Sequence, residues 1–320
     1  MQYVRRSRLR EARVTAAHTT WERVLCALAG TDAGRRMTAR FAARLGADAW
    51  AARTLTNAVD EVTAPTCGAL ATFAEARRRG IRTVLTHDLP LLRVMHADLD
   101  RAALVHPGCA FLHRYRAPAA LVARQEAEYV LSDVICVRGH FAREALMARG
   151  IAAARIQAVP SPAFEPRVLA PRRVGHDPVL LLAGLATARN GTMEVRAALA
   201  AQPRWTAVVR TGEGLDPPDL LRHPRIRAAS RAELEHLEGI DAVVAPAWCE
   251  SHAPEIARAV RQGVPVVATR RAAGFVDLAA AGIEIAPGHA AGLAAALDEL
   301  RAPSELCLAK NRRQHRLGVR

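Results

Sequence analysis

The sequence predicts an α/β protein of two domains, each built on a parallel β-sheet, and three observations predict it. Short apolar runs rich in Val, Leu and Ile alternate with amphipathic stretches from residue 60 to residue 300, which is typical of strand–helix–strand units. A proline-rich segment interrupts this alternation near residue 170. The chain has 320 residues, a length at which two domains are the usual expectation.

The first half reads as a helical start followed by alternating elements. Apolar and charged residues follow helical spacing through the first 56 residues, without a strand pattern. Further on, Gly80 and Gly150 each follow an amphipathic stretch, as helix-ending glycines do. The expected elements are a strand at 61–65, a helix at 69–79, a strand at 81–86, helices at 90–103 and 117–128, a strand at 134–137, a helix at 141–149 and a strand at 156–159.

Five prolines between residues 160 and 178 mark the predicted linker. A boundary there gives an N-terminal domain at 1–168 and a C-terminal domain at 169–320. The alternation then resumes. The expected elements are strands at 179–183, 206–210, 241–246, 264–268 and 283–286, and helices at 192–201, 231–237, 254–262 and 290–300.

A polar loop at residues 248–252 carries the densest set of reactive side chains in the second half. It follows the buried run at 241–246, and the helix behind it begins near Pro254 and ends before Gly263. Strand, helix and strand with short joints form a parallel βαβ unit, and such units bind ligands beyond the carboxyl ends of their strands. The sequence therefore predicts a site at this loop, in a cleft between the two domains.

The charge of the chain bears on its partners. The formal net charge is +14, and Lys310 is the only lysine among 45 basic residues. Nucleic acid is one partner that such a charge suits. The arginines are dispersed along the chain, however. A bacterial-type composition rich in arginine and alanine explains the positive charge at least as well as selection for phosphate binding does. We therefore predict no nucleic acid as partner, and favour anionic substrates or a membrane surface.

The cysteines and the N-terminus indicate a cytoplasmic protein. The N-terminus lacks the apolar segment of a secretory signal, and no apolar run has the length to cross a bilayer. Peripheral association at the inner membrane face is the alternative location. No CxxC pair occurs, which argues against a disulfide framework and a zinc site. The six cysteines, predicted to be reduced and mostly structural, are Cys26, Cys67, Cys109, Cys136, Cys249 and Cys307.

Three passages occur in an order and spacing that is known from one enzyme family. Residues 127–160 read as strand, turn and helix with a closing Gly-Ile, Arg-Ile and Val-Pro, and residues 178–200 as a strand and a helix. Glu250 stands thirteen residues before the run Gly-Val-Pro-Val-Val-Ala at 263–268. In these passages the chain resembles the retaining nucleotide-sugar glycosyltransferases of family 4. The likeness covers most of residues 60–300 and implies the GT-B architecture, two Rossmann-like domains facing a cleft.

The resemblance implies roles for the loop after residue 249. Glu250 takes the place of the first glutamate of the family's Glu-x7-Glu motif, which lies against the donor sugar near the reacting carbon. Amides at the start of the following helix take the place of those that hold the diphosphate, a use that the helix dipole favours. These amides belong to Ser251, His252, Ala253 and Glu255. The side chain of His252 is either a pocket residue or solvated.

Two positions depart from the family's pattern. Arg258 stands where the family has the second glutamate, and an arginine cannot accept hydrogen bonds from ribose hydroxyls. Glu255, one helical turn away, is a candidate substitute; alternatively it pairs with Arg258 on an exposed helix face. Asn190 stands where the family usually has a lysine that balances the charge of the diphosphate. Arg189 and Arg210 are the candidates to supply that charge.

His87 follows an expected strand at a position where the family's first domain often presents a histidine to the cleft. A surface or capping role is the alternative for it. The family's first domain also opens with a strand and a glycine-rich loop, whereas this chain reads as helix there. We therefore expect an incomplete first domain, explained by truncation, a mis-assigned start or a degenerate paralogue.

The resemblance implies transfer of a sugar from a nucleoside-diphosphate sugar to an unknown glycan, lipid or small-molecule acceptor, with retention. Such a reaction needs no metal and no cofactor, because the protein mainly positions groups and stabilises the leaving phosphate. The alternative is a catalytically inactive protein of the same fold that binds a nucleotide sugar or a partner. Arg258 and Asn190 favour that alternative. A nucleic-acid-binding protein is favoured by the net charge alone.

Overall fold

A computed structural model describes residues 3–4, 33–87, 89–159, 177–212, 218–249 and 254–301. The chain divides into two compact units. The first unit comprises Met1–His96, Arg116–Arg138 and Ala142–Val159, and the second comprises Ala97–Tyr115, Gly139–Phe141 and Pro160–Arg320. Two short stretches from the first half thus belong to the second unit. The predicted boundary between residues 168 and 169 lies outside the described residues.

The first unit holds a sheet in the order β1-β2-β3-β4-β5. β2 to β5 pair in parallel and in chain order, whereas β1 pairs with β2 antiparallel. Ala64, Leu85 and Ile135 stand in register across the three central strands and are fully buried. The strands are β1 Tyr3–Val4, β2 Glu61–Pro65, β3 Arg82–Thr86, β4 Val134–Val137 and β5 Ile156–Ala158.

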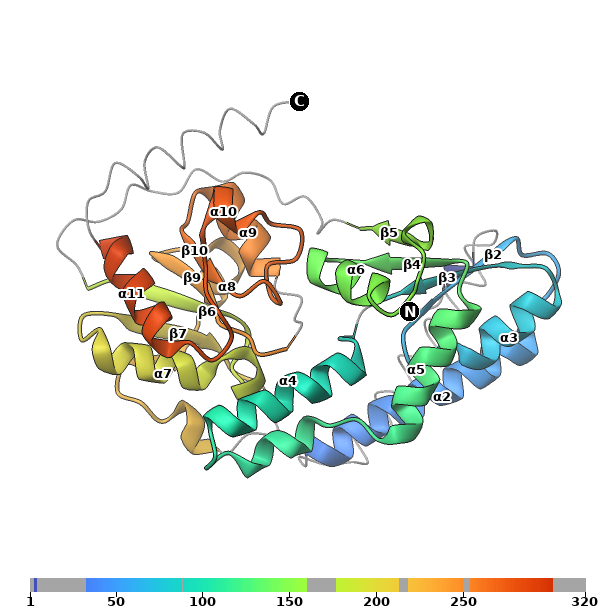
Figure 1. The fold of residues 1–320 in the computed structure, drawn as a ribbon, viewed down its shortest axis with the longest axis horizontal. Helices are drawn as coiled ribbons and strands as arrows, with labels where there is room; N and C mark the ends of the chain where they lie inside the picture. Colours follow the sequence, from blue (N-terminus) through green and yellow to red (C-terminus); the bar gives the residue numbers. More distant parts are fainter. Residues whose placement is uncertain are drawn as a thin grey trace. The chain divides into compact units, whose positions relative to one another are not determined.

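The helices of the first half run from α2 to α6. α3 packs against both α2 and α5, and the three helices lie side by side in Figure 1. Phe73 of α3 is fully buried beneath them. The bounds are α2 Ala33–Thr54, α3 Leu70–Arg78, α4 Leu92–Val105, the 3-10 helix η1 Ala110–Tyr115, α5 Ala119–Leu131 and α6 His140–Met147.

Strand β1 corrects the expectation of a purely helical start. Tyr3 lies opposite Thr63, and Val4 lies opposite Val62. A two-residue strand is too short to show the alternation by which strands are recognised, and its pairing with β2 spans about sixty residues of chain. The predicted helical character holds for α2.

The second unit holds a six-stranded parallel sheet in the order β11-β10-β9-β6-β7-β8. From β6 the chain adds β7 and β8 on one side, then returns to add β9, β10 and β11 on the other. This is the strand order of doubly wound dinucleotide-binding domains, whose ligands bind where the order reverses. The reversal lies between β6 and β9. We call the carboxyl ends of these two strands, with the loops that follow them, the switch point.

Strand β8 is absent from the predicted elements, as is the short helix α10. β8 is a three-residue edge strand with only one partner strand, so it carries no apolar pattern. The strands are β6 Val179–Leu185, β7 Thr206–Arg210, β8 Ile226–Ala228, β9 Ala242–Ala245, β10 Val266–Ala268 and β11 Ile283–Glu284. The helices are α7 Thr192–Ala201, α8 Arg231–His236, α9 Pro254–Gln262, α10 Leu278–Ala281 and α11 Ala290–Arg301.

Both faces of the second sheet are covered, which explains its continuous apolar strands. Leu180 and Leu182 of β6 point to the face that α7 and α11 cover, where Trp205 is fully buried. Leu181, between them, packs on the opposite face with Ile256 of α9. Successive strand residues alternate between faces, so a strand buried on both sides must be apolar at every position.

Two arginines donate to carbonyl oxygens at or just beyond the ends of helices, each from a position just before a later strand. The guanidinium of Arg225, next to β8, donates to the carbonyl oxygens of Gln202 at 2.8 Å and Trp205 at 3.1 Å, just beyond the end of α7. Arg155, next to β5, donates to the carbonyl oxygen of Tyr129 in the last turn of α5 at 2.6 Å. Basic groups at helix ends satisfy carbonyls that have no partner in the helix. Part of the positive charge is thus used inside the fold.

Within the described residues, no helix combines the length and hydrophobicity that crossing a bilayer requires.

Glu233 at the start of α8 gives a prediction for the pH dependence of stability. Its carboxylate accepts from the Ser230 amide at 2.7 Å and from Arg227 at 2.9 Å. The hydrogen bond with Arg227 is the main reason why the pKa of Glu233 falls from 4.5 to about 2. A carboxyl group with a lowered pKa stabilises the fold above its unfolded pKa, and this contribution is lost as the pH falls towards 2.

Glu233→Gln is therefore expected to lower the free energy of unfolding by about 1–2 kcal/mol at pH 7. The loss relative to wild type should shrink between pH 4.5 and the pKa of about 2, as measured by urea unfolding followed by circular dichroism. Glu235→Gln, which removes an exposed pair with Arg231 on the same helix, is the matched control and should change little. Equal losses at both ends of the pH range would contradict this prediction.

Candidate functional site

Three loops meet at the switch point of the second unit. The 3-10 helix η3, Ala188–Asn190, follows β6, and residues 246–249 follow β9. The amide of Trp248 donates to the carbonyl oxygen of Arg189 at 3.0 Å, which ties the two loops together. The hydroxyl of Thr269, next to β10, donates to the carbonyl oxygen of Ala247 at 2.9 Å. The carboxyl ends of β6, β9 and β10 are thus held as one surface.

Gly191, between η3 and α7, allows these backbones to approach. Its φ of 92° lies in the left-handed region, which residues other than glycine rarely adopt. A Cβ atom at this position would stand 2.5 Å from both the ring and the carbonyl oxygen of Pro246. The start of α7 therefore lies directly against the chain that leaves β9.

Arg189 and Asn190 lie at the switch point. Asn190 is buried, and its side-chain amide donates to the carbonyl oxygen of Leu185 at 2.8 Å. Its Oδ1 atom has no hydrogen-bond partner among the described residues. The half-buried guanidinium of Arg189 lies 5.7 Å from the ring centroid of Tyr115, a cation–π distance. Both donor-binding candidates of this loop are therefore near the expected ligand position.

Arg210 and Glu255 form an ion pair across the end of β6. Arg210 is the last residue of β7, Glu255 lies in the first turn of α9, and β7 and β9 flank β6 on its two sides. Glu255 is 1% exposed, and its Oε2 atom has no hydrogen-bond partner in the described part of the chain. This pair brings two of the predicted donor-binding residues together at the switch point.

Arg258 has a different partner from the one that its spacing suggests. Its guanidinium donates to the carbonyl oxygen of Leu234 in α8. Glu255 is buried and pairs with Arg210. The alternative prediction, a Glu255–Arg258 pair on an exposed helix face, is therefore wrong. The guanidinium of Arg258 joins α9 to α8.

Glu250, Ser251, His252 and Ala253 lie outside the described residues. Of the same loop, Cys249 is described and fully buried. Burial raises the pKa of the Cys249 thiol to about 12, although the charge of Arg189 acts in the opposite direction. A thiol with such a pKa is not a nucleophile at neutral pH. The structure therefore agrees with a packing role for Cys249.

His87 lies in the first unit, directly after β3 as expected. Its side chain is buried, with 4% of the residue exposed, so the alternative prediction that His87 is a surface residue is wrong. Its Nδ1 atom lies 3.1 Å from the hydroxyl of Tyr129 in α5. The role at a cleft that the resemblance implies for His87 stays a prediction.

A triad of Glu194, Trp248 and His106 beside the switch point was not predicted from the sequence. One oxygen of Glu194, in the first turn of α7, accepts from Trp248 Nε1 at 2.8 Å and lies 2.7 Å from His106 Nε2. Glu194 is fully buried, and its other oxygen has no partner among the described residues. His106 and Glu194 are 88 residues apart and Glu194 and Trp248 are 54 apart, so no local motif predicts the triad.

A second missed group is an ion pair after β10. Arg271 contacts both oxygens of the buried Asp98 carboxylate, at 2.7 and 2.9 Å, and Arg101 contacts one of them at 2.6 Å. The guanidinium of Arg271 also lies 4.9 Å from the ring centroid of Phe141. The only sign of this ion pair in the sequence is the short run Arg270-Arg271, which does not indicate Asp98 as the partner.

The arrangement suits an anion. The guanidinium group of Arg189 belongs to the loop after β6, and that of Arg210, at the end of the neighbouring strand β7, pairs with Glu255. In the part of the chain that the structure describes, no side-chain carboxylate accepts from the amides of Met193 and Glu194 in the first turn of α7. A helix start of this kind favours negative charge. No group of three or more His, Cys, Asp or Glu side chains with the geometry of a metal site occurs among the described residues.

Comparison with known proteins relates the fold to solved structures. No family model and no curated protein matches the chain in sequence. Sucrose-phosphate synthase from Thermosynechococcus elongatus aligns with a TM-score of 0.60 over 87% of this chain and 74% of its own, at 15% identity. HepE of Anabaena, in complex with UDP and glucose, aligns with a TM-score of 0.58 over 85% and 76%, at 14% identity.

An α,α-trehalose-phosphate synthase (UDP-forming) from Burkholderia vietnamiensis aligns with a TM-score of 0.55 over 87% of this chain and 74% of its own, at 13% identity. At these identities the likeness is one of fold. It confirms the predicted α/β class with two parallel-stranded sheets, as in GT-B structures.

Proposed function

We propose that this protein transfers a sugar from a nucleoside-diphosphate sugar to an acceptor, with retention of the anomeric configuration. One observation carries the proposal. The two loops to which the resemblance assigns the donor, η3 with Arg189 and Asn190 and the start of α9, flank the switch point of the second sheet. The shared fold with HepE, which holds UDP and glucose, supports the same placement of a donor.

In the proposed reaction the bond between the anomeric carbon and the diphosphate oxygen breaks, and its electron pair leaves with the diphosphate. The acceptor hydroxyl forms the new bond on the same face and passes its proton to the oxygen of the departing diphosphate. Arg189 and Arg210 would balance the charge of the leaving diphosphate, together with amides at helix starts. Glu250 would lie against the sugar. No step of this scheme calls for a metal ion or a cofactor.

The base-carrying half of the donor needs an acceptor for its ribose hydroxyls. Arg258 cannot serve, because a guanidinium has donors only and this one contacts Leu234. We propose Glu255 instead, because its Oε2 atom is buried and has no partner among the described residues. The ion pair with Arg210 would hold this carboxylate in place.

A panel of UDP-, GDP- and ADP-sugars in a thermal-shift assay, followed by donor hydrolysis, tests the proposal. At least one nucleotide sugar is expected to raise the thermal midpoint and to be hydrolysed slowly in the absence of acceptor. Glu250→Gln should lower turnover by a factor of about 100 or more while binding persists. Glu299→Gln, an exposed change on α11, is the control and should leave both unchanged.

Two other outcomes are informative. If no nucleotide sugar shifts the thermal midpoint, the proposal is wrong. Binding without turnover would instead support the inactive nucleotide-sugar-binding protein. In that case Arg258→Glu should restore turnover if the arginine is the cause. The acceptor, whether glycan, lipid or small molecule, is to be sought at the cytoplasmic face of the membrane and in the cytoplasm.

A further inference from the structure

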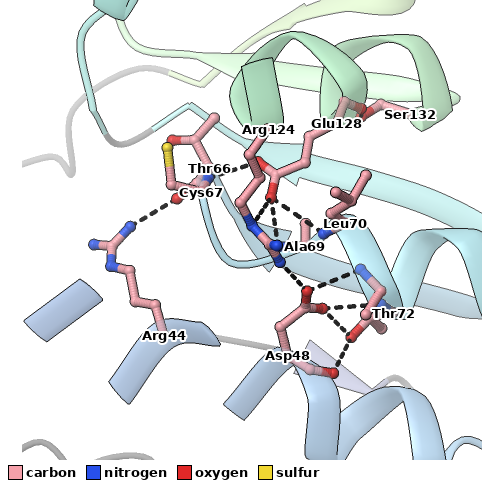
Figure 2. Close-up of polar contacts among 11 residues, drawn as sticks. Arg44, Asp48, Thr66, Cys67, Ala69, Leu70, Thr72, Arg124, Glu128 and Ser132 are labelled. Carbon is pink, nitrogen blue, oxygen red and sulfur yellow. Dashed lines mark hydrogen bonds and ion pairs between the residues drawn. The ribbon is translucent and has the colours of Figure 1, made fainter. Parts of the chain in front are cut away.

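The start of α3, in the first unit, is occupied by side chains of the protein itself. The first four amides of a helix have no partner within it. Here Glu128 of α5 and Asp48 of α2 accept from all four, as Figure 2 shows. Glu128 accepts from the amides of Ala69 at 2.9 Å and Leu70 at 3.1 Å, and Asp48 from those of Ala71 at 2.8 Å and Thr72 at 2.9 Å.

The loop between β2 and α3 joins the same arrangement. The amide of Cys67 donates to the second oxygen of Glu128 at 2.5 Å. Cys67 has a φ of 63°, unusual for a residue other than glycine, and this backbone geometry places its amide beside Glu128. We call the five amides of Cys67 and residues 69–72 the α3 cradle.

The two carboxylates are held as a pair. Arg124 of α5 contacts Asp48 and lies 3.3 Å from an oxygen of Glu128 (Figure 2). Both acids are fully buried. Burial, as the main cause, raises the pKa of Glu128, and the amides of the cradle and Arg124 act against it. Two buried carboxylates against one guanidinium leave a net negative charge, which the amides of the helix start offset.

In doubly wound domains the helix start after a strand is where the phosphate of a ligand binds, through backbone amides. The α3 cradle has this position and this chemistry, since it follows β2 and consists of amides. We infer that the first unit fills its own anion-binding cradle: the carboxylates of Glu128 and Asp48 stand in for a phosphate, and an external anion is excluded. A phosphate-bearing ligand must then use the second unit.

The topology of the two sheets supports this division. β2 to β5 follow one another in chain order, so the parallel part of the first sheet has no reversal among its described strands. The second sheet has its reversal between β6 and β9, and among the described residues no side-chain carboxylate accepts from the amides of Met193 and Glu194 at the start of α7. The assignment of a nucleotide to the second unit rests on the proposed function. The filled cradle does not, and it is tested without a nucleotide.

Removing the internal anion should create a site for an external one. Glu128→Ala is expected to lower the thermal midpoint by about 10 °C, because three backbone amides lose their acceptor and Arg124 loses one of its two ion-pair partners. Sodium formate, which supplies a carboxylate small enough for the vacated space, should raise the midpoint again as its concentration increases. Sodium chloride at the same ionic strength should not. Thermal unfolding followed by circular dichroism measures both effects.

Glu126→Ala is the matched control. Glu126 lies on the same helix but pairs at the surface with Arg93, at 2.7 Å, and with Arg149. Formate should raise neither its midpoint nor that of wild type. Inorganic phosphate is avoided as the probe because it could also bind at the switch point. A response to formate that is equal in the wild type, Glu126→Ala and Glu128→Ala overturns the inference.

A variant that keeps the shape of the side chain covers the case in which Glu128→Ala does not fold. Recovery of folded Glu128→Ala only when formate is present during refolding supports the inference. If formate recovers none, Glu128→Gln decides. Its amide group keeps one accepting oxygen but turns a second N–H towards the cradle, so its midpoint should fall clearly below that of wild type, without rescue by formate. An unchanged midpoint would show that no anion is needed there.

Discussion

Gly191→Ala is expected to lower the free energy of unfolding of the second unit by about 3–5 kcal/mol, the sum of backbone strain and overpacking. The strain arises because alanine disfavours the φ of 92° found at this position. The overpacking arises because the new Cβ would stand 2.5 Å from the carbonyl oxygen of Pro246, and neither backbone can move without the other. Urea unfolding followed by circular dichroism measures the loss.

Gly239→Ala separates the two causes. Gly239, in the same unit, also has a positive φ, 70°, but its surroundings leave nothing within 4 Å of a Cβ atom. This variant carries the strain alone and should lose about 1 kcal/mol. A comparable loss in both variants would mean that the approach of α7 to Pro246 matters little. If the proposed function is correct, Gly191→Ala should also weaken nucleotide-sugar binding, because the switch point cannot keep its shape.

Glu194→Ala is expected to have a similarly large effect, about 3–5 kcal/mol. The change leaves a cavity below the first turn of α7 and removes the acceptor of Trp248 Nε1, which is 2.8 Å away and buried. His106 loses its partner in the same step. A shift of the tryptophan fluorescence spectrum in the folded state, together with urea unfolding, would record both consequences.

Glu194→Gln is the control for shape. The glutamine oxygen can still accept from Trp248, so its loss should be clearly smaller than that of alanine. The amide group then takes the position of Oε2, which has no partner among the described residues. Equal losses for the two variants would argue that the charge of Glu194, rather than the hydrogen bond to Trp248, stabilises this region.

Local signals predicted the elements well where the chain carries them. The α9 helix begins at Pro254 and ends before Gly263, and the structure gives the same bounds as the sequence. The strands β4 and β7 also have the predicted bounds, because a short β-branched run between turn residues indicates a buried strand. The two-residue strand β1 lacked such a signal, since its pairing depends on a distant strand.

The candidate site could be predicted only in part. The family resemblance assigns Arg189, Asn190, Arg210 and Glu255 to one donor site, and the structure has them at strand ends and helix starts of the second sheet. Their partners could not be predicted, because an ion pair such as Arg210–Glu255 joins segments 45 residues apart and depends on strand order. The same holds for Glu194, whose partner Trp248 is 54 residues away. Spacing within a segment carries no information on such contacts.

The arginine-rich composition also required the structure for its interpretation. Arg155 and Arg225 donate to carbonyl oxygens at helix ends, and Arg271 to a buried carboxylate. A guanidinium presents several donors in one plane, which lysine cannot match. A net charge therefore overstates the positive surface that is left for partners.

The α3 cradle differs from a ligand site in its dependence on concentration. Glu128 and Asp48 are attached to α5 and α2, which themselves pack on α3, so their effective concentration at the cradle is fixed by the fold. A diffusing anion would stabilise this helix start only to an extent that depends on its free concentration. The tethered carboxylates therefore make the stabilisation of this helix start independent of the concentration of any free anion.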